Sequence, residues 1–171
     1  MMFVQRRIAA QQVARDFVVT AQVFADTFVQ YIASDEGNLA AEVRAHRRRE
    51  ACAAVWASIR ATFDASGFTE TERLAVLPLV RAALIPFWQK HCNREEGLGE
   101  LFDGRATHYL RNRDPDSQLK TAARIMQEVV AALDGDAARV LPVRTLTALL
   151  AHRMLTDLRR LGEIKANYTI E

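Results

Sequence analysis

Residues 69–92 read TETERLAVLPLVRAALIPFWQKHC, and this stretch decides the fold class. It opens with the spacing of a capping box, in which the Thr69 side chain accepts a hydrogen bond from an early helix N–H and Glu72 reaches back to the Thr69 N–H. The residues from Leu74 to Trp88 then carry a single charge, Arg81. A helix with almost no polar face is one that other helices surround. We therefore expect residues 69–92 to form the central helix of an all-α protein.

Two prolines interrupt this predicted helix. Pro78 and Pro86 each remove a backbone donor and push against the carbonyl four residues earlier, so we expect a kink or a break near one or both. Pro78 also suits the first position of a second helix, where its missing N–H costs nothing. Two short helices that pack normally are the simpler expectation. A bent helix that leaves a ligand cavity beside it is the alternative.

Length and composition are those of an ordinary globular chain. The 171 residues are 50% apolar and 26% charged, with a formal net charge of +2, which suits one folded domain. We expect a single helical domain over residues 1–162 and a flexible tail over 163–171. No apolar run reaches the roughly 18 residues of a membrane span, so no membrane partner is expected. Two cysteines, Cys52 and Cys92, are too few for a disulfide framework and indicate reduced thiols in a cytoplasmic protein.

Helical periodicity recurs along the rest of the chain. Apolar residues return every third or fourth position, and no stretch alternates as a strand does. The sequence thus predicts an all-α, single-domain bundle of six or seven helices with a proline-interrupted central helix. The other expected helices cover most of 3–33, about 38–66, 98–109, a stretch from the Asp114–Pro115 boundary to 133, and 142–162, with breaks at 34–38 and 134–136.

The first predicted helix is apolar on two sides. Two such sides indicate a helix that is sandwiched inside the fold or lies between subunits. We expect Val18, Val29 and Ile32, from the second side, to form an interface between two copies of the chain. The leading functional hypothesis is therefore a regulatory or adaptor-type module that binds a protein partner or itself, as a homodimer, without an evident catalytic site.

The second hypothesis is a pocket for a small apolar ligand beside Pro78 and Pro86, in a binding protein or an enzyme. Such a pocket combines an apolar lining with a few polar groups at its mouth. The sequence contains no catalytic motif, so whether the protein is an enzyme stays open at this point. The residues expected to bind the ligand are Trp88, His91, Arg105, His108 and Tyr109.

The third hypothesis is nucleic-acid binding through a basic run, Arg44, Arg47, Arg48 and Arg49. Phosphate contacts need lysines and arginines on one accessible face. Successive residues of a helix point in different directions, so Arg47, Arg48 and Arg49 cannot share one face. Acidic residues also bracket the run, which makes a solvated helix face the simpler interpretation.

Metal and cofactor chemistry have little support. The histidines His46, His91, His108 and His152 fall on four different predicted helices, and the Glu-x-x-His spacing of di-iron bundles is absent. His91 precedes Cys92, but adjacent side chains of a helix point about 100° apart, so His91 is a poor base for that thiol. We expect both cysteines to be buried structural thiols, and no metal or cofactor. No stretch of the sequence identifies a family.

Overall fold

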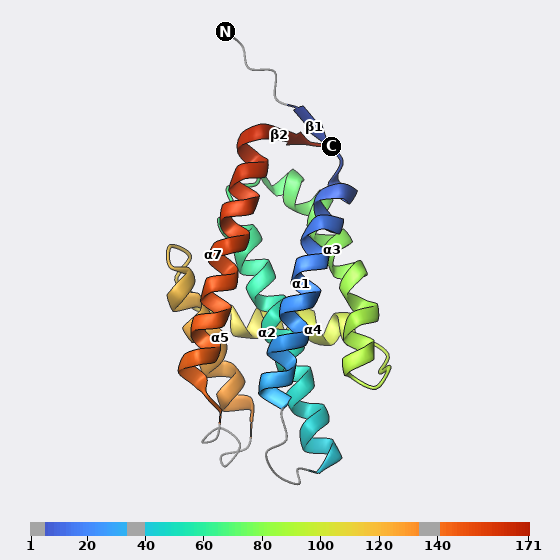
Figure 1. The fold of residues 1–171 in the computed structure, drawn as a ribbon, viewed down its shortest axis with the longest axis vertical. Helices are drawn as coiled ribbons and strands as arrows, with labels where there is room; N and C mark the ends of the chain where they lie inside the picture. Colours follow the sequence, from blue (N-terminus) through green and yellow to red (C-terminus); the bar gives the residue numbers. More distant parts are fainter. Residues whose placement is uncertain (1–5, 34–39, 134–140) are drawn as a thin grey trace.

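Six α-helices and one pair of short strands make up the described part of the chain (Figure 1). The structure, a computed structural model, describes residues 6–33, 40–133 and 141–171. The predicted breaks at 34–38 and 134–136 lie outside these residues. The all-α fold class is confirmed. The elements are β1 (Arg6–Ile8), α1 (Ala10–Ala33), α2 (Ala41–Ala65), α3 (Glu70–His91), α4 (Leu98–Tyr109), α5 (Gln118–Ala132), α7 (Val143–Asn167) and β2 (Tyr168–Ile170).

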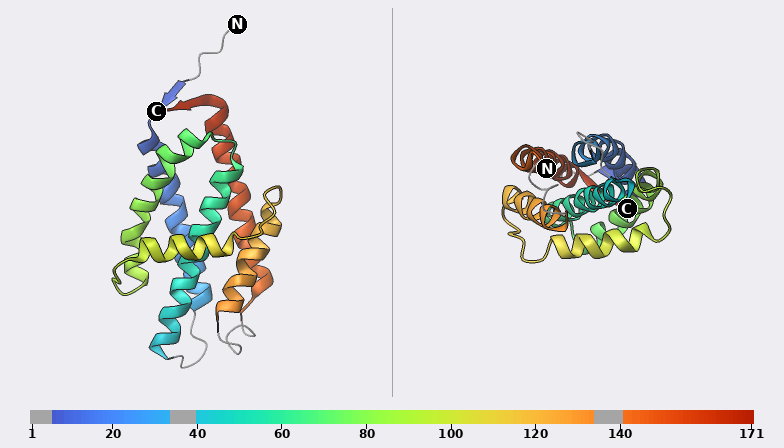
Figure 2. Two further views of the ribbon diagram at one scale, coloured as in Figure 1. Left: turned by 180° about the vertical axis from the view of Figure 1, so that it is seen from behind. Right: turned by 90° about the horizontal axis from the view of Figure 1, so that it is seen from below.

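The central helix of the bundle is α2, and the prediction that α3 is central is wrong. Helices α1 and α7 form one face of the molecule and α4 crosses the opposite face, with α2 between them (Figure 2). Helix α2 packs against α1, α3, α4, α5 and α7. Every residue from Glu50 to Ile59 is buried. The small side chains of Ala51, Ala53, Ala54 and Ala57 let the neighbouring helices approach from all sides. A sequence pattern of bulky apolar residues does not reveal such a helix.

Helix α3 runs through both prolines without the predicted break. Pro78 and Pro86 are exposed, and so are Leu74 and Ala82, the residues four positions before them. Water can therefore hydrogen-bond the two carbonyls that lack a helical donor, while packing of the opposite face holds the helix together. That buried face consists of Val76, Val80, Leu84, Phe87 and Trp88.

Side-chain caps define where α3 and α5 begin. The predicted capping box is present: Glu72 N donates to Thr69 Oγ1 at 3.2 Å, and Thr69 N donates to Glu72 Oε2 at 2.7 Å. The boundary predicted at Asp114–Pro115 precedes α5. The N-cap of that helix is Ser117, whose hydroxyl accepts a hydrogen bond from Lys120 N at 3.3 Å. Local capping rules thus place both helix starts to within a few residues.

The C-terminal residues do not form the predicted flexible tail. Helix α7 continues through Gly162, where a stop was expected, to Asn167, and residues 168–170 form β2. Strand β2 pairs in parallel with β1, in the register Arg6 to Tyr168 and Ile8 to Ile170. The first helix consequently begins at Ala10, after the strand, and not near residue 3. Neither strand alternates over enough residues to be recognised before its partner is known.

Candidate functional site

Trp88, one of the five predicted ligand residues, lies in the core. Its ring packs edge-on against Trp56, with ring centroids 5.6 Å apart, and against Phe102, with centroids 4.9 Å apart. The buried Trp88 Nε1 has no hydrogen-bond partner among the described residues. Trp88 therefore forms part of the packing behind the surface and does not line a pocket.

Arg105 and Tyr109 come together on a buried carboxylate. Both donate to Glu50 of α2, Arg105 through Nη2 at 2.5 Å and Tyr109 through its hydroxyl. The Arg105 guanidinium also lies over the Tyr109 ring, 5.2 Å from the centroid. These contacts satisfy the buried carboxylate and fasten α4 to α2, which is a structural role.

The two predicted site histidines contact different helices. His91 Nε2 lies 2.8 Å from Asp26 Oδ1 of α1, and His91 lines a hollow of about 480 Å³ at the end of α3. His108 Nε2 lies 2.9 Å from Glu128 Oε2 of α5. The structure therefore does not bring the five predicted ligand residues, Trp88, His91, Arg105, His108 and Tyr109, together around one pocket.

The predicted interface residues are inside the protein. Val18, Val29 and Ile32 are all buried in the core, with exposed fractions of 6%, 2% and 0%. Helix α1 packs against α2 and α3, which accounts for its second apolar side. Of the two readings of that helix, the sandwiched one is correct, and these three residues do not form a surface.

A surface groove lies beside Pro78, although none of the five residues expected to bind a ligand lines it. This groove, of about 500 Å³, lies between α2, α3 and α4. Its apolar lining comes from Leu74, Leu77 and Pro78 of α3 and from Trp56 of α2. Leu74 is 67% exposed, so this apolar lining faces solvent.

Asp103 of α4 organises the polar side of this groove. Its carboxylate accepts a hydrogen bond from Trp56 Nε1 at 2.8 Å and another from Arg81 Nε at 2.8 Å. The bond to Asp103 raises the pKa of the Arg81 guanidinium. A Cβ at Gly99 would lie 2.5 Å from Arg81 Nη2, so this glycine leaves room for the guanidinium. The three helices are thus joined through one carboxylate at the edge of the groove.

Arg60 also lines the groove, and its contacts differ from those of Arg81. Arg60 Nη1 donates to the Asp103 backbone oxygen at 3.3 Å and to Thr107 Oγ1 at 3.0 Å. Both acceptors are neutral. Within the described ranges, Arg60 has no carboxylate within ion-pair distance. It is a half-buried cation without a counter-ion.

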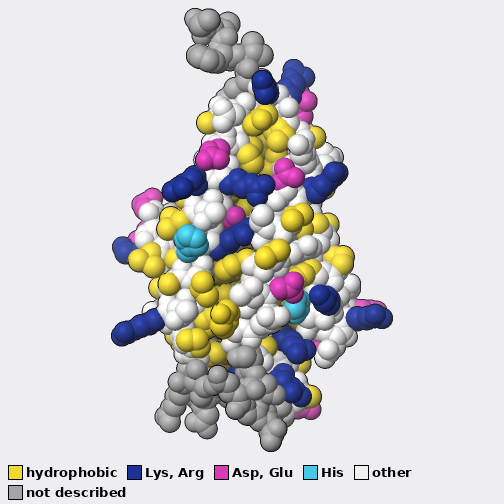
Figure 3. Space-filling view, viewed as in Figure 1, with side chains coloured by type: hydrophobic (Ala, Val, Ile, Leu, Met, Phe, Trp, Pro, Cys, Tyr) yellow, Lys and Arg dark blue, Asp and Glu magenta, His cyan; other side chains and the backbone are white. Residues whose placement is uncertain are grey.

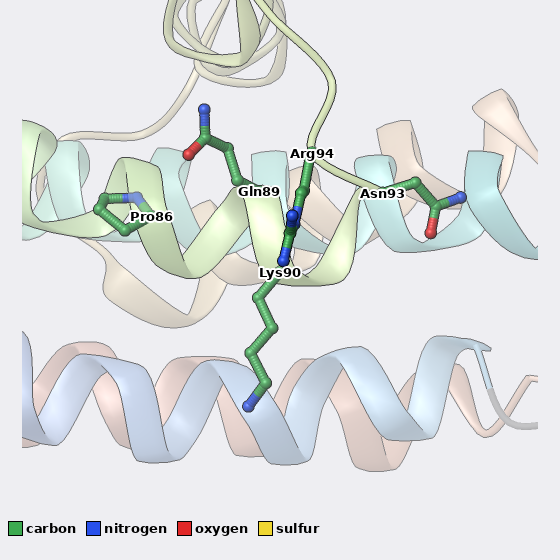
Figure 4. Close-up of a pocket in the computed structure, with 5 residues that line it drawn as sticks. All are labelled: Pro86, Gln89, Lys90, Asn93 and Arg94. Atoms are coloured by element: carbon green, nitrogen blue, oxygen red, sulfur yellow. The ribbon is translucent and has the colours of Figure 1, made fainter.

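The hollow beside Pro86 is larger, about 740 Å³, but less organised. Its polar residues are Gln89, Lys90, Asn93 and Arg94. In Figure 4 Lys90 extends toward α1, whereas Gln89 and Asn93 point in other directions. Since these side chains do not converge on one point, this hollow offers a ligand no defined set of contacts.

The sequence contained a signal for the Pro78 groove that periodicity alone did not assign. Trp56 and Arg60 are four residues apart on α2, and Asp103 and Thr107 are four apart on α4, so each pair shares a helix face. The sequence could not show that these two faces meet α3 at the groove.

The basic run on α2 does not form one accessible surface, because Arg47 is buried and Arg49 forms an ion pair with Glu95.

No group of three or more His, Cys, Asp or Glu side chains that could hold a metal ion occurs in residues 6–33, 40–133 or 141–171. Within the same residues, no helix has both the length and the apolar character that crossing a membrane requires. Compared with protein-family models, with curated proteins and with solved structures, the chain gives no match in any of the three.

Proposed function

We propose that this protein binds a small molecule with an apolar part in the groove beside Pro78. The observation that carries the proposal is the composition of the groove, in which an apolar wall on α3 lies beside guanidinium, carboxylate and hydroxyl groups from α2 and α4. Its volume of about 500 Å³ lies within the range of about 300–1,000 Å³ that is typical of ligand sites. Apolar lining supplies affinity in such sites, and a few polar groups fix the orientation of the ligand.

Burial of the apolar wall would contribute free energy to ligand binding. Leu74 is largely exposed, Leu77 is half-buried and Pro78 is exposed. A hydrocarbon chain placed on this wall removes apolar surface from water on both partners. The gain is about 25 cal/mol for each Å² of apolar surface removed.

A titration with 1-decanol, followed by calorimetry, tests the proposal. We expect saturable binding to the wild-type chain. Leu74→Asp, which places a charge on the apolar wall, should weaken this binding about tenfold or more because the carboxylate must lose water when the ligand binds. The matched control is Leu119→Asp, since Leu119 of α5 is 59% exposed and does not line the groove.

Circular dichroism should give the same helical spectrum for both variants, because both side chains are already exposed. Absence of saturable decanol binding to the wild-type chain contradicts the proposal. An equal loss of binding in the two variants contradicts it as well, since that result places the ligand elsewhere.

A second candidate is a regulatory or adaptor-type interaction module that self-associates through the outer side of α1. Val19 is 59% exposed and Val23 is 67% exposed, one turn apart. Both line a hollow of about 360 Å³ between α1 and α7, together with Phe24 and Leu149. Figure 3 shows apolar side chains gathered over α1 and α7 on this face. Exposed apolar side chains of this kind favour contact with another protein surface, and Thr20, Thr27 and Arg153 add polar groups to the same hollow.

Sedimentation velocity over a micromolar concentration range tests self-association. If α1 forms the contact, Val23→Glu should shift the protein toward monomer while Leu155→Glu, an exposed change on α7, should not. Val29→Glu is unsuitable as a probe, because Val29 is buried and the change should unfold the chain. A wild-type protein that is monomeric throughout the range excludes this candidate.

A further inference from the structure

We infer that the ligand of the Pro78 groove is an amphipathic organic anion, a carboxylate whose acidic group binds Arg60 and whose hydrocarbon part covers Leu74, Leu77 and Pro78. The inference rests on the proposed function of the groove and adds the charge of the ligand and its orientation.

The bonding of Arg60 supplies the first step. A guanidinium has five N–H donors, and the described residues engage only Nη1 of Arg60, with two neutral oxygens. The Asp103 carboxylate beside it is already bound by Trp56 and Arg81. Among the described residues, Arg60 therefore retains unused N–H donors and forms no ion pair at the edge of the groove.

The other charges that line the groove supply the second step. Arg73 Nη1 lies 3.0 Å from Asp64 Oδ1, and Arg113 Nη2 lies 2.6 Å from the other oxygen of the same carboxylate. Three arginines and three carboxylates line the groove in total, so its formal charges cancel. These groups do not all form ion pairs with one another. Arg60 and Glu70 are the two lining groups for which no ion pair is found among the described residues.

Arg60 and Glu70 differ in their surroundings, and this difference selects the sign of the ligand. Glu70 is exposed and lies in the first turn of α3, where water and the helix N–H groups stabilise its negative charge. Arg60 is half-buried on α2, so its charge has lost part of its hydration. A half-buried charge without a counter-ion gains more from a bound partner than an exposed one, which favours an anion.

The arrangement of the lining residues sets the orientation. Arg60 and Thr107 lie on α2 and α4, whereas Leu74, Leu77 and Pro78 are on α3. Leu77 and Pro78 lie three and four residues after Leu74, so all three share one face of α3. A ligand that spans the groove therefore meets a guanidinium and a hydroxyl at one side and hydrocarbon at the other.

Three ligands with the same hydrocarbon chain test the inference on the full chain by calorimetry: decanoate, 1-decanol and decyltrimethylammonium, all below micelle-forming concentrations. We expect decanoate to bind about tenfold more tightly than decanol, because a charge-assisted bond to Arg60 replaces one to water, and the cationic ligand to bind most weakly. Arg60→Gln should abolish the preference for decanoate over decanol. Arg159→Gln, the same change at an exposed position on α7, should preserve it.

The outcomes separate this inference from the proposed function. Equal binding of decanoate and decanol to the wild-type chain, or an unchanged decanoate preference in Arg60→Gln, overturns the anion inference and leaves the groove as an apolar-ligand site. Failure of all three ligands to bind overturns both. The comparison of decanoate with decanol on the wild-type chain requires no variant, so it tests the anion inference even if Arg60→Gln is unstable.

Discussion

Cys52 of α2 and Cys92, at the end of α3, influence each other's ionisation, although 39 residues separate them in the sequence. Both are free thiols and both are buried, as expected. A hydrogen bond with Cys52 lowers the pKa of Cys92, although burial acts in the opposite direction. The same bond and burial raise the pKa of Cys52. The two shifts have opposite directions, so Cys92 is the more readily ionised thiol of the pair.

Replacement of Cys52 by alanine should raise the pKa of Cys92. The variant removes the donor that stabilises the thiolate, while the burial that opposes ionisation remains. Cys52→Ser is the matched control, because its hydroxyl still donates and should keep the pKa of Cys92 low. Ultraviolet absorbance of the thiolate across a pH titration measures the effect. An identical titration of Cys92 in wild type and Cys52→Ala would show that the hydrogen bond has no such role.

At the scale of the element, α3 is held at its start by contacts that also reach α7. Glu72 closes the capping box with Thr69 and accepts a hydrogen bond from Lys165 Nζ of α7 at 2.6 Å. Burial alone would raise the pKa of Glu72, but the hydrogen bonds from Lys165 and Thr69 outweigh it, and the pKa is lowered. One carboxylate therefore caps a helix and joins two helices.

Glu72→Gln should lower the free energy of unfolding at neutral pH by up to about 1 kcal/mol, because the amide can still close the capping box but loses the ion pair with Lys165. Because the folded state lowers the pKa of Glu72, its contribution is complete above about pH 4.3, the ordinary value for glutamate, and is lost as pH falls through the lowered value. Wild type and variant should therefore converge in acid. Denaturant unfolding at several pH values measures this.

Glu70→Gln is the matched control for that change, since Glu70 lies in the same first turn but has no capping contact. Its effect should be smaller, a few tenths of a kcal/mol from the helix dipole alone. Equal losses in the two variants, or a stability difference between wild type and Glu72→Gln that persists in acid, would be inconsistent with a stabilising ion pair between Glu72 and Lys165.

At the scale of the whole molecule, the bundle depends on small residues in α2. Ala51, Ala53, Ala54 and Ala57 all have no exposed surface. Five other helices pack on α2, so these positions have no free direction into which a larger side chain could extend. The small side chains of the central helix therefore determine how closely the other helices can pack against it.

Ala54→Leu should destabilise the protein by about 1–3 kcal/mol, the typical cost of overpacking a filled core. Ala83→Leu, an exposed position on the outer side of α3, should change stability by less than about 0.5 kcal/mol. The two variants add the same side chain to a helix, so the difference between them isolates packing. Denaturant midpoints provide the comparison, and equal midpoints would contradict the assignment of α2 as the central helix.

The sequence alone predicted features that depend on neighbours within one or two helical turns. The capping box at Thr69, the bounds of α4 and the helical class of the chain were all predictable, because caps and a periodicity of 3.6 residues are local properties. For the candidate site, the sequence offered a pocket beside Pro78 and Pro86 only as an alternative, and none of the five residues expected to bind a ligand lines the Pro78 groove. The sequence could not name Arg60 or Asp103, because each became a site residue only through contact with another helix.

Only the tertiary structure decided which helix is central, where the second apolar side of α1 packs, and that residues 168–170 pair with residues 6–8. The physical reason is the same in each case. An apolar residue is drawn out of water whichever surface covers it, so the pattern records that Val29 is buried and not what buries it. The covering surface is chosen by the packing of all six described helices together. Within these helices, the same packing places Arg60 beside an open groove without an ion-pair partner.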